Sequence, residues 1–165
     1  MPRRLPRTLS VVSVRCAGPH DKSVIAGAMA KTGPDVEYTP GEMSRSSGVL
    51  IVDDMPQTRR FVSRVLDREG FQTFEAENGA TAYAAARSHP DDIDVALVDV
   101  ELPGAWGREV GAALKRAIPD ARVVYITGHD IDTLVAEGRL PDDAVVLQKP
   151  FTVAALVDTV RSRRR

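Results

Sequence analysis

Five polar residues stand at or directly after the ends of short apolar runs, where a strand would give way to a loop: Asp53, Asp54, Asp99, Thr127 and Lys149. Carboxylates that share one site repel each other when all are ionised, and a hard divalent cation such as Mg²⁺ relieves that repulsion. A threonine hydroxyl and a lysine ammonium both suit phosphoryl oxygens. The set therefore predicts phosphoryl transfer, with Asp99 attacking phosphorus while Mg²⁺, Thr127 and Lys149 offset the charge that develops on the oxygens.

The segments that would position these residues alternate between strand and helix. Short, β-branched apolar runs are typical of strands covered on both faces, and apolar residues three and four positions apart are typical of helices. The predicted strands span 49–52, 71–76, 94–99, 122–127 and 144–148, and the predicted helices span 56–70, 79–89, 107–117, 130–138 and 152–162. Five such βα units predict an α/β fold, a doubly wound five-stranded parallel sheet of the flavodoxin-like type, (βα)5. In the first predicted helix, Phe61, Val62, Val65 and Leu66 share one apolar face.

A sheet of this kind brings the predicted site together, because ligands of doubly wound sheets bind beyond the carboxyl ends of the strands. Taken singly, each residue has a plainer interpretation. Asp53 alone is most simply a loop or N-cap residue, Thr127 a strand-end hydroxyl and Lys149 a surface charge. The prediction depends on their occurring as a set on consecutive βα units.

The composition narrows the class of protein. The chain has 165 residues, enough for one ordinary domain. Its single cysteine, Cys16, excludes a disulfide framework, and no apolar run approaches the length of a membrane span, so a cytoplasmic location is the default expectation. The segment 48–160 is acidic, which argues against nucleic acid as the main partner of the fold. Residues 1–47, rich in Pro, Gly, Ser and charge, are predicted to be a disordered extension, and 163–165 to be a basic tail.

Four segments resemble signature segments of a known family. "VLIVDDMP", "VALVDVELPG", "YITG" and "LQKPF" are similar, in order and spacing, to the response-regulator receiver domain of two-component signalling. The resemblance covers residues 48–162, and the run from "YITG" onward is particularly similar to receivers of hybrid histidine kinases. No single segment is specific, but all four together are.

The resemblance implies a role for each site residue. Asp99 would be the phosphoacceptor. Asp54 and Asp99 would ligate Mg²⁺ directly, the backbone carbonyl of Glu101 would be a third protein ligand, and Asp53 would act mainly through water.

The remaining roles concern the switch. Thr127 would be the switch hydroxyl, Lys149 would contact the phosphoryl group, and the peptide bond before Pro150 would be cis. Val146 occupies a position that is usually aromatic in this family, so the aromatic half of the coupling between the site and the output surface is absent. Glu101 and His129 hold positions that tune phosphoryl lifetime in this family. Two arrangements are open: the side chains pair with each other, or both point into solvent and have no effect.

The function implied is that of a stand-alone, single-domain response regulator. It would accept a phosphoryl group from a histidine kinase or a histidine phosphotransfer protein and signal to a downstream protein target, or act as a phosphate sink. We expect no enzymatic activity beyond its own phosphorylation and dephosphorylation, no DNA-binding domain and no membrane anchor, and a homodimer is open.

Two other classes of function remain open. A phosphorylation-independent adaptor on the same fold is mildly favoured by Val146 and disfavoured by the intact acidic set. A Mg²⁺-dependent phosphatase is disfavoured because Glu101 stands where aspartate-nucleophile phosphatases carry a second aspartate.

Overall fold

The computed structural model describes residues 46–163. Most of the predicted disordered extension and the last two residues of the predicted basic tail lie outside the described residues. The strands of the main sheet are β1 (Gly48–Val52), β2 (Gln72–Ala76), β3 (Ile93–Asp99), β6 (Arg122–Thr127) and β7 (Val145–Gln148). The helices are α1 (Pro56–Arg68), α2 (Gly79–Ser88), α3 (Gly107–Ala117), α4 (Ile131–Ala136) and α5 (Val153–Arg161).

The main sheet is parallel and five-stranded, in the order β2-β1-β3-β6-β7, as the sequence predicts. Every residue of the central strand β3 is buried, both the apolar run 95–98 that predicted the strand and the aspartates Asp94 and Asp99 on either side of it. The strand order reverses between β1 and β3, which makes the gap between these two strands the switch point. Asp53 directly follows β1, and Asp99 is the last residue of β3, so both lie at the switch point. That is where sheets of this type bind ligands.

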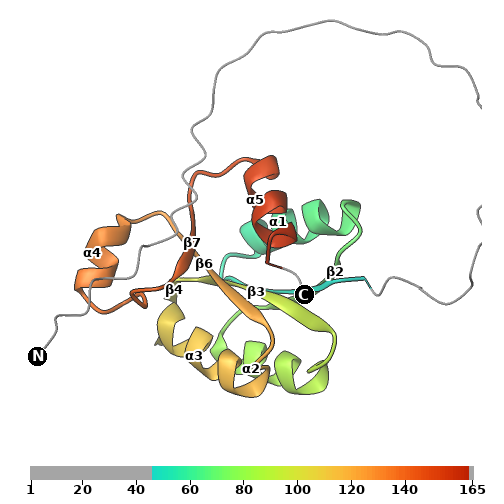
Figure 1. The fold of residues 1–165 in the computed structure, drawn as a ribbon, viewed down its shortest axis with the longest axis horizontal. Helices are drawn as coiled ribbons and strands as arrows, with labels where there is room; N and C mark the ends of the chain where they lie inside the picture. Colours follow the sequence, from blue (N-terminus) through green and yellow to red (C-terminus); the bar gives the residue numbers. More distant parts are fainter. Residues whose placement is uncertain (1–45, 164–165) are drawn as a thin grey trace, which may run out of the picture. The chain divides into compact units, whose positions relative to one another are not determined.

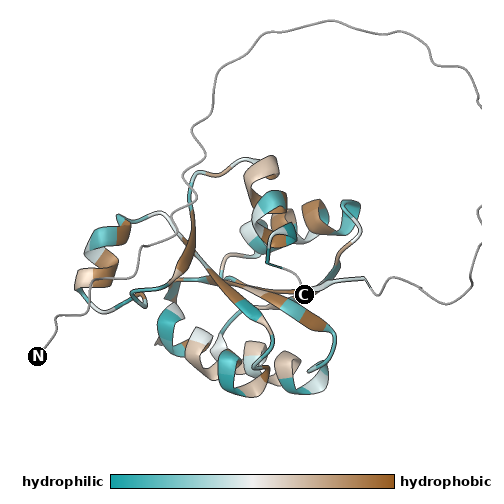
Figure 2. Ribbon diagram, in the orientation of Figure 1, coloured by the Kyte–Doolittle hydropathy of each residue, from teal (hydrophilic) through white to brown (hydrophobic). Residues whose placement is uncertain are grey.

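Helices cover both faces of the sheet. Helices α1 and α5 lie on one face and α2 and α3 on the other (Figure 1), and the buried side chains form two clusters accordingly. Short α4 joins the cluster of α2 and α3 through Ile131 and Leu134. In Figure 2 the strands are largely hydrophobic, whereas the helices also carry hydrophilic stretches. None of the helices in the described part is both long and apolar enough to cross a membrane.

The grouping of Phe61 with the buried side of α1 is wrong. Val62 and Leu66 are buried, but the Phe61 side chain is 52 % exposed. Because each helical residue turns by about 100°, Phe61 falls at the margin of the stripe that reaches the sheet. The apolar pattern therefore overestimated the buried face by one residue.

One further element, a small antiparallel hairpin after β3, was not predicted. It consists of β4 (Glu101–Leu102) and β5 (Ala105–Trp106), paired so that Glu101 lies opposite Trp106. Gly104 turns the chain between them at a φ of 76°. At Gly107, where α3 begins, a Cβ atom would lie 2.4 Å from the backbone oxygen of Asp99, so α3 can start this close only at a glycine.

Candidate phosphoacceptor site

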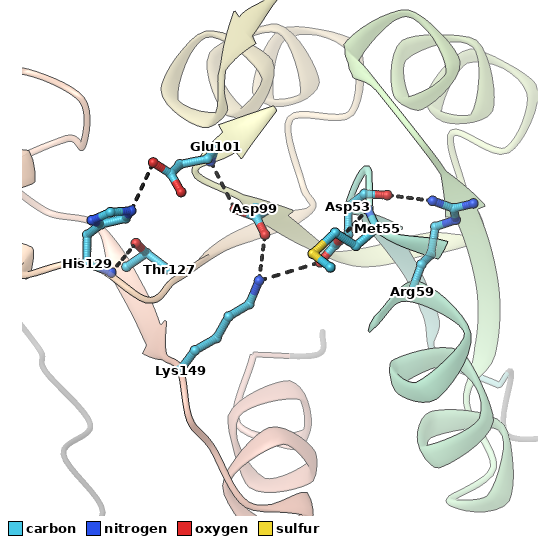
Figure 3. A network of polar contacts seen from close by, with 8 residues as sticks. All are labelled: Asp53, Met55, Arg59, Asp99, Glu101, Thr127, His129 and Lys149. Carbon is cyan, nitrogen blue, oxygen red and sulfur yellow. Dashed lines mark hydrogen bonds and ion pairs between the residues drawn. The ribbon is translucent and has the colours of Figure 1, made fainter. Parts of the chain in front are cut away.

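Asp99 is the centre of the candidate site. It ends β3, is 8 % exposed, and both its carboxylate oxygens are engaged. Oδ2 accepts a hydrogen bond from Nζ of Lys149 at 2.6 Å, and Oδ1 accepts one from the backbone N–H of Glu101 at 2.9 Å. Figure 3 shows Lys149 reaching up from the end of β7 toward this carboxylate. Two strand ends thus converge on Asp99, with a cation held against one oxygen.

Lys149 lies between two acidic side chains. Its Nζ is also 3.7 Å from Oδ2 of Asp53. Burial by itself would lower the pKa of the ammonium, but the hydrogen bond to Asp99 and the charges of Asp99 and Asp53 outweigh burial and raise that pKa. Lys149 therefore carries its charge here. The Lys149–Pro150 peptide is cis, as the resemblance implies.

Asp53 is held more tightly than its neighbour Asp54. It is 3 % exposed, and its Oδ1 accepts a hydrogen bond from the backbone N–H of Met55 at 2.8 Å. Burial raises the pKa of the Asp53 carboxyl; that hydrogen bond and Lys149 oppose the rise, while Asp99 and Asp54 add to it. Asp54 is exposed and lines an open groove of about 700 Å³ with residues of the β2–α2 loop and of the β4–β5 turn.

The donor set fits Mg²⁺. Within residues 46–163, no three His, Cys, Asp or Glu side chains lie together as a preassembled metal group. The predicted ligand set does not need one, because it uses two carboxylates and a backbone carbonyl and leaves the other positions to water, as Mg²⁺ usually does. The ammonium of Lys149 already stands as a cation beside Asp53 and Asp99. Burial and the neighbouring acids Asp99 and Asp54 raise the pKa of the Asp53 carboxyl, and a divalent cation bound here would reduce the repulsion between these carboxylates.

Thr127 completes the set at the carboxyl end of β6. The residue is almost fully buried, and its Oγ1 accepts a hydrogen bond from the backbone N–H of His129 at 3.0 Å. Its backbone oxygen accepts one from the N–H of Lys149 at 2.7 Å. Because the hydroxyl oxygen is the acceptor in the bond with His129, the hydroxyl can still donate its own proton to another acceptor.

Glu101 and His129 face each other, which is the paired one of the two arrangements that the sequence left open. Nε2 of His129 lies 2.9 Å from Oε1 of Glu101, and both side chains are more than half exposed. The pair joins the hairpin after β3 to the loop after β6 (Figure 3). It thereby links the two segments that follow Asp99 and Thr127 in the sequence.

Sequence reasoning missed Arg59. Its Nη1 donates a hydrogen bond to the backbone oxygen of Asp53 at 2.6 Å, and its Nε pairs with Glu75 at 3.2 Å. The sequence shows only that Arg59 lies in the first turn of α1, the helix that follows Asp53 and Asp54. Arg59 therefore fixes the loop that carries Asp53 and Asp54. Val146, the departure from the family, is buried beside Tyr125 on β6.

Comparisons with known proteins agree with this geometry. The family model described as response regulator receiver domain matches residues 49–161. Response regulator receiver protein CpdR of Brucella abortus is 30% identical over 112 residues, which cover 68% of this chain and 92% of that protein. Sporulation initiation phosphotransferase F of Bacillus subtilis is 30% identical over 114 residues, with 68% and 90% covered.

Solved structures give the same result. The Vibrio cholerae chemotaxis protein CheY4 superposes with a TM-score of 0.64 at 27% identity, over 72% of this chain and 98% of that one. The CheX–CheY–BeF3–Mg²⁺ complex from Borrelia burgdorferi gives a TM-score of 0.62 at 27% identity, over 70% and 87%. Together with the acidic site at the switch point, these matches show that the chain belongs to the response regulator receiver domain family of two-component signalling.

Proposed function

We propose that the chain accepts a phosphoryl group on Asp99 from a histidine kinase or a histidine phosphotransfer protein, in a Mg²⁺-dependent reaction. Proteins of this family are generally phosphoacceptors that bind Mg²⁺ and interact with histidine kinases and other proteins. The observation that carries the proposal is the 2.6 Å contact between Lys149 and Asp99, at the end of the central strand and beside Asp53. We expect the reaction to occur in the cytoplasm.

The proposed step forms one bond and breaks one. A carboxylate oxygen of Asp99 attacks phosphorus, the P–N bond to the donor histidine breaks, and the leaving imidazole nitrogen keeps the electron pair and takes up a proton. Lys149 stays beside Asp99 and stabilises the negative charge on the transferred group, and Thr127 can donate its hydroxyl proton to another phosphoryl oxygen. Asp54, Asp99 and the Glu101 carbonyl would hold Mg²⁺, with Asp53 acting through water, and the metal would neutralise phosphoryl oxygens.

Signalling would follow from a changed binding surface or from removal of phosphoryl groups from another protein. Thr127 leads directly into the loop before α4, through its hydrogen bond with His129. A movement of Thr127 toward a phosphoryl group would therefore pull on that loop. We propose that the surface formed by this loop and α4 binds the downstream protein.

Phosphorylation with a small donor tests the proposal. The full chain should form a phosphorylated species with acetyl phosphate and Mg²⁺, seen by Phos-tag electrophoresis, and Asp99→Asn should not, because an amide is a poor nucleophile at phosphorus. Asp158→Asn removes an equivalent charge from the exposed side of α5 and should label like wild type. If Asp99→Asn labels like wild type, Asp99 is not the acceptor.

Val146 favours a second candidate, a phosphorylation-independent adaptor. The residue is buried and aliphatic, so no aromatic ring is available at this position to move when Thr127 moves. An adaptor would bind its target with equal affinity in wild type and Asp99→Asn, whether or not acetyl phosphate is present. A receiver would bind it differently in the two states.

A further inference from the structure

Trp106, the last residue of β5, makes a contact that the proposed chemistry does not use. The guanidinium carbon of Arg139 lies 4.2 Å from the centre of the Trp106 ring, a cation–π arrangement. Arg139 comes three residues after the end of α4, and its Nε also pairs with Glu137 at 3.0 Å. Trp106 is 41 % exposed even so. A large ring is therefore kept at the surface, against the turn that ends α4.

A second contact holds the same turn. Nη1 of Arg108, in the first turn of α3, donates a hydrogen bond to the carbonyl oxygen of Gly138 at 2.5 Å. Gly138 has a φ of 69°, and a Cβ atom there would lie 3.3 Å from that same Nη1. Trp106 thus contacts Arg139, and Arg108 binds Gly138, the residue before it in the same turn. We call these four residues the clasp.

The clasp is connected to the acceptor Asp99 through the β4–β5 hairpin. Trp106 lies directly opposite Glu101 in the β4–β5 hairpin. Glu101 donates its backbone N–H to Asp99, and its carbonyl is the predicted third metal ligand. The N–H of Gly107, the residue after Trp106, donates to the carbonyl of Val100, the residue between β3 and β4, at 2.9 Å and closes the base of the hairpin. A continuous set of contacts therefore runs from Arg139 through Trp106 and Glu101 to Asp99.

We propose that Trp106 and Arg139 are positioning residues of the acceptor site. Their contact fixes the hairpin that carries Glu101, whose carbonyl would be a ligand of Mg²⁺, and it would couple metal binding at the site to the end of α4. Coupling of this kind is reciprocal: if the Trp106–Arg139 contact strengthens metal binding by a given free energy, metal binding strengthens the contact by the same free energy. With Val146 in place of an aromatic, the clasp gives the site a second connection to α4. The inference rests on the proposed function, because it needs the site to bind metal.

Metal affinity without any turnover is the first test. Mg²⁺ binding is measured by isothermal titration calorimetry on the full chain for wild type, Arg139→Ala, Arg139→Lys and Arg116→Ala, the last an exposed arginine at the far end of α3. Arg139→Ala should weaken Mg²⁺ binding about two- to fivefold, the equivalent of about 0.5–1 kcal/mol for an exposed cation–π contact. Arg139→Lys should recover part of the loss, and Arg116→Ala should bind like wild type. A purely structural contact would lower the melting temperature of Arg139→Ala and leave its Mg²⁺ affinity unchanged, and that result overturns the inference.

Trp106 provides the second test, because it is the only tryptophan in the chain. Mg²⁺ with beryllofluoride, an analogue of the phosphoryl group, should change its fluorescence emission in wild type and in Arg116→Ala but not in Asp99→Asn. This arm needs no substitution at Arg139, so it decides even if Arg139→Ala does not fold. Calorimetric binding by wild type with no change in Trp106 emission would overturn the inference alone. Absence of any Mg²⁺ or beryllofluoride binding by wild type would overturn the proposed function with it.

Discussion

The ammonium of Lys149 and the carboxylate of Asp99 are in contact at 2.6 Å although fifty residues separate them in the sequence. Lys149 also lies near Asp53, so a single cation serves two buried acids. This arrangement has opposite consequences for stability and for metal binding, because the ammonium stabilises both carboxylates and repels any other cation that approaches them.

Lys149→Ala should therefore lower the stability of the metal-free protein and raise its affinity for Mg²⁺. Without metal the free energy of unfolding should fall by about 1.5–3 kcal/mol, the contribution of a hydrogen bond to a charged group. Mg²⁺ should nevertheless bind more tightly, because a competing positive charge is gone. Urea unfolding and Mg²⁺ titration check the two expectations, with exposed Lys115→Ala as the control. Weaker Mg²⁺ binding in Lys149→Ala would contradict this account of the site.

Asp54 should matter for metal and little for folding. It is exposed, so its removal relieves little repulsion, and surface substitutions usually change stability by no more than about 0.5 kcal/mol. Asp54→Asn should weaken Mg²⁺ binding about tenfold or more, because a charged ligand becomes neutral. Asp91→Asn makes the same charge change at an exposed residue before the amino end of β3, at the other end of the strand from Asp99, and should leave Mg²⁺ affinity intact. Equal Mg²⁺ affinity in wild type and Asp54→Asn would remove Asp54 from the ligand set.

The pair between Glu101 and His129 should lengthen the lifetime of phospho-Asp99. It joins the two loops beside the acceptor and should hinder the approach of hydrolytic water. Glu101→Gln, His129→Ala and the double variant are compared with wild type by following loss of phosphate, with His89→Ala as the control. Exposed side-chain contacts of this kind contribute at most about 1 kcal/mol, so the coupling between the two substitutions should be at most about fivefold. Strictly additive effects would show that the pair has no role in lifetime.

Acid should loosen the start of α4 through Asp130. Hydrogen bonds from the side chain and then from the backbone N–H of Thr133 lower the pKa of the Asp130 carboxyl below its unfolded value. Its stabilising effect is therefore complete above the unfolded pKa and is lost as the pH falls through the lower, folded pKa. Amide exchange at Thr133 should accelerate there in wild type. Asp130→Asn keeps a good N-cap and should remove this acid dependence; if the dependence persists, its origin lies elsewhere.

The sequence predicted most of what depends on long, regular patterns. The five strands of the main sheet, the helices between them and the convergence of Asp53, Asp99, Thr127 and Lys149 all follow from apolar runs and the rule for parallel sheets. The hairpin of β4 and β5 could not be found in that way, because strands of two residues have no periodicity to detect. Phe61 was misplaced because a pattern gives the direction of a side chain but not the width of the surface that covers it.

The contacts of Arg59 and Arg139 show another limit. Each depends on where a flexible, charged side chain ends in space, and many surface arginines would fit the same pattern in the sequence. Only the fold brings Arg59 to the backbone of Asp53 and Arg139 to the ring of Trp106.

The six residues of α4 stand in contrast to β3, which is buried along its whole length. Segments with few buried apolar contacts open at lower free energy than core strands, and amide exchange reports this difference residue by residue. We therefore expect the amides of β3 to exchange only through global unfolding, and those of α4 to exchange through local opening that leaves Asp99 in place. The protein would then carry its reactive group on a persistent strand and its adjustable surface on a less persistent helix, so that the surface can be rearranged without loosening the scaffold that holds the reactive group.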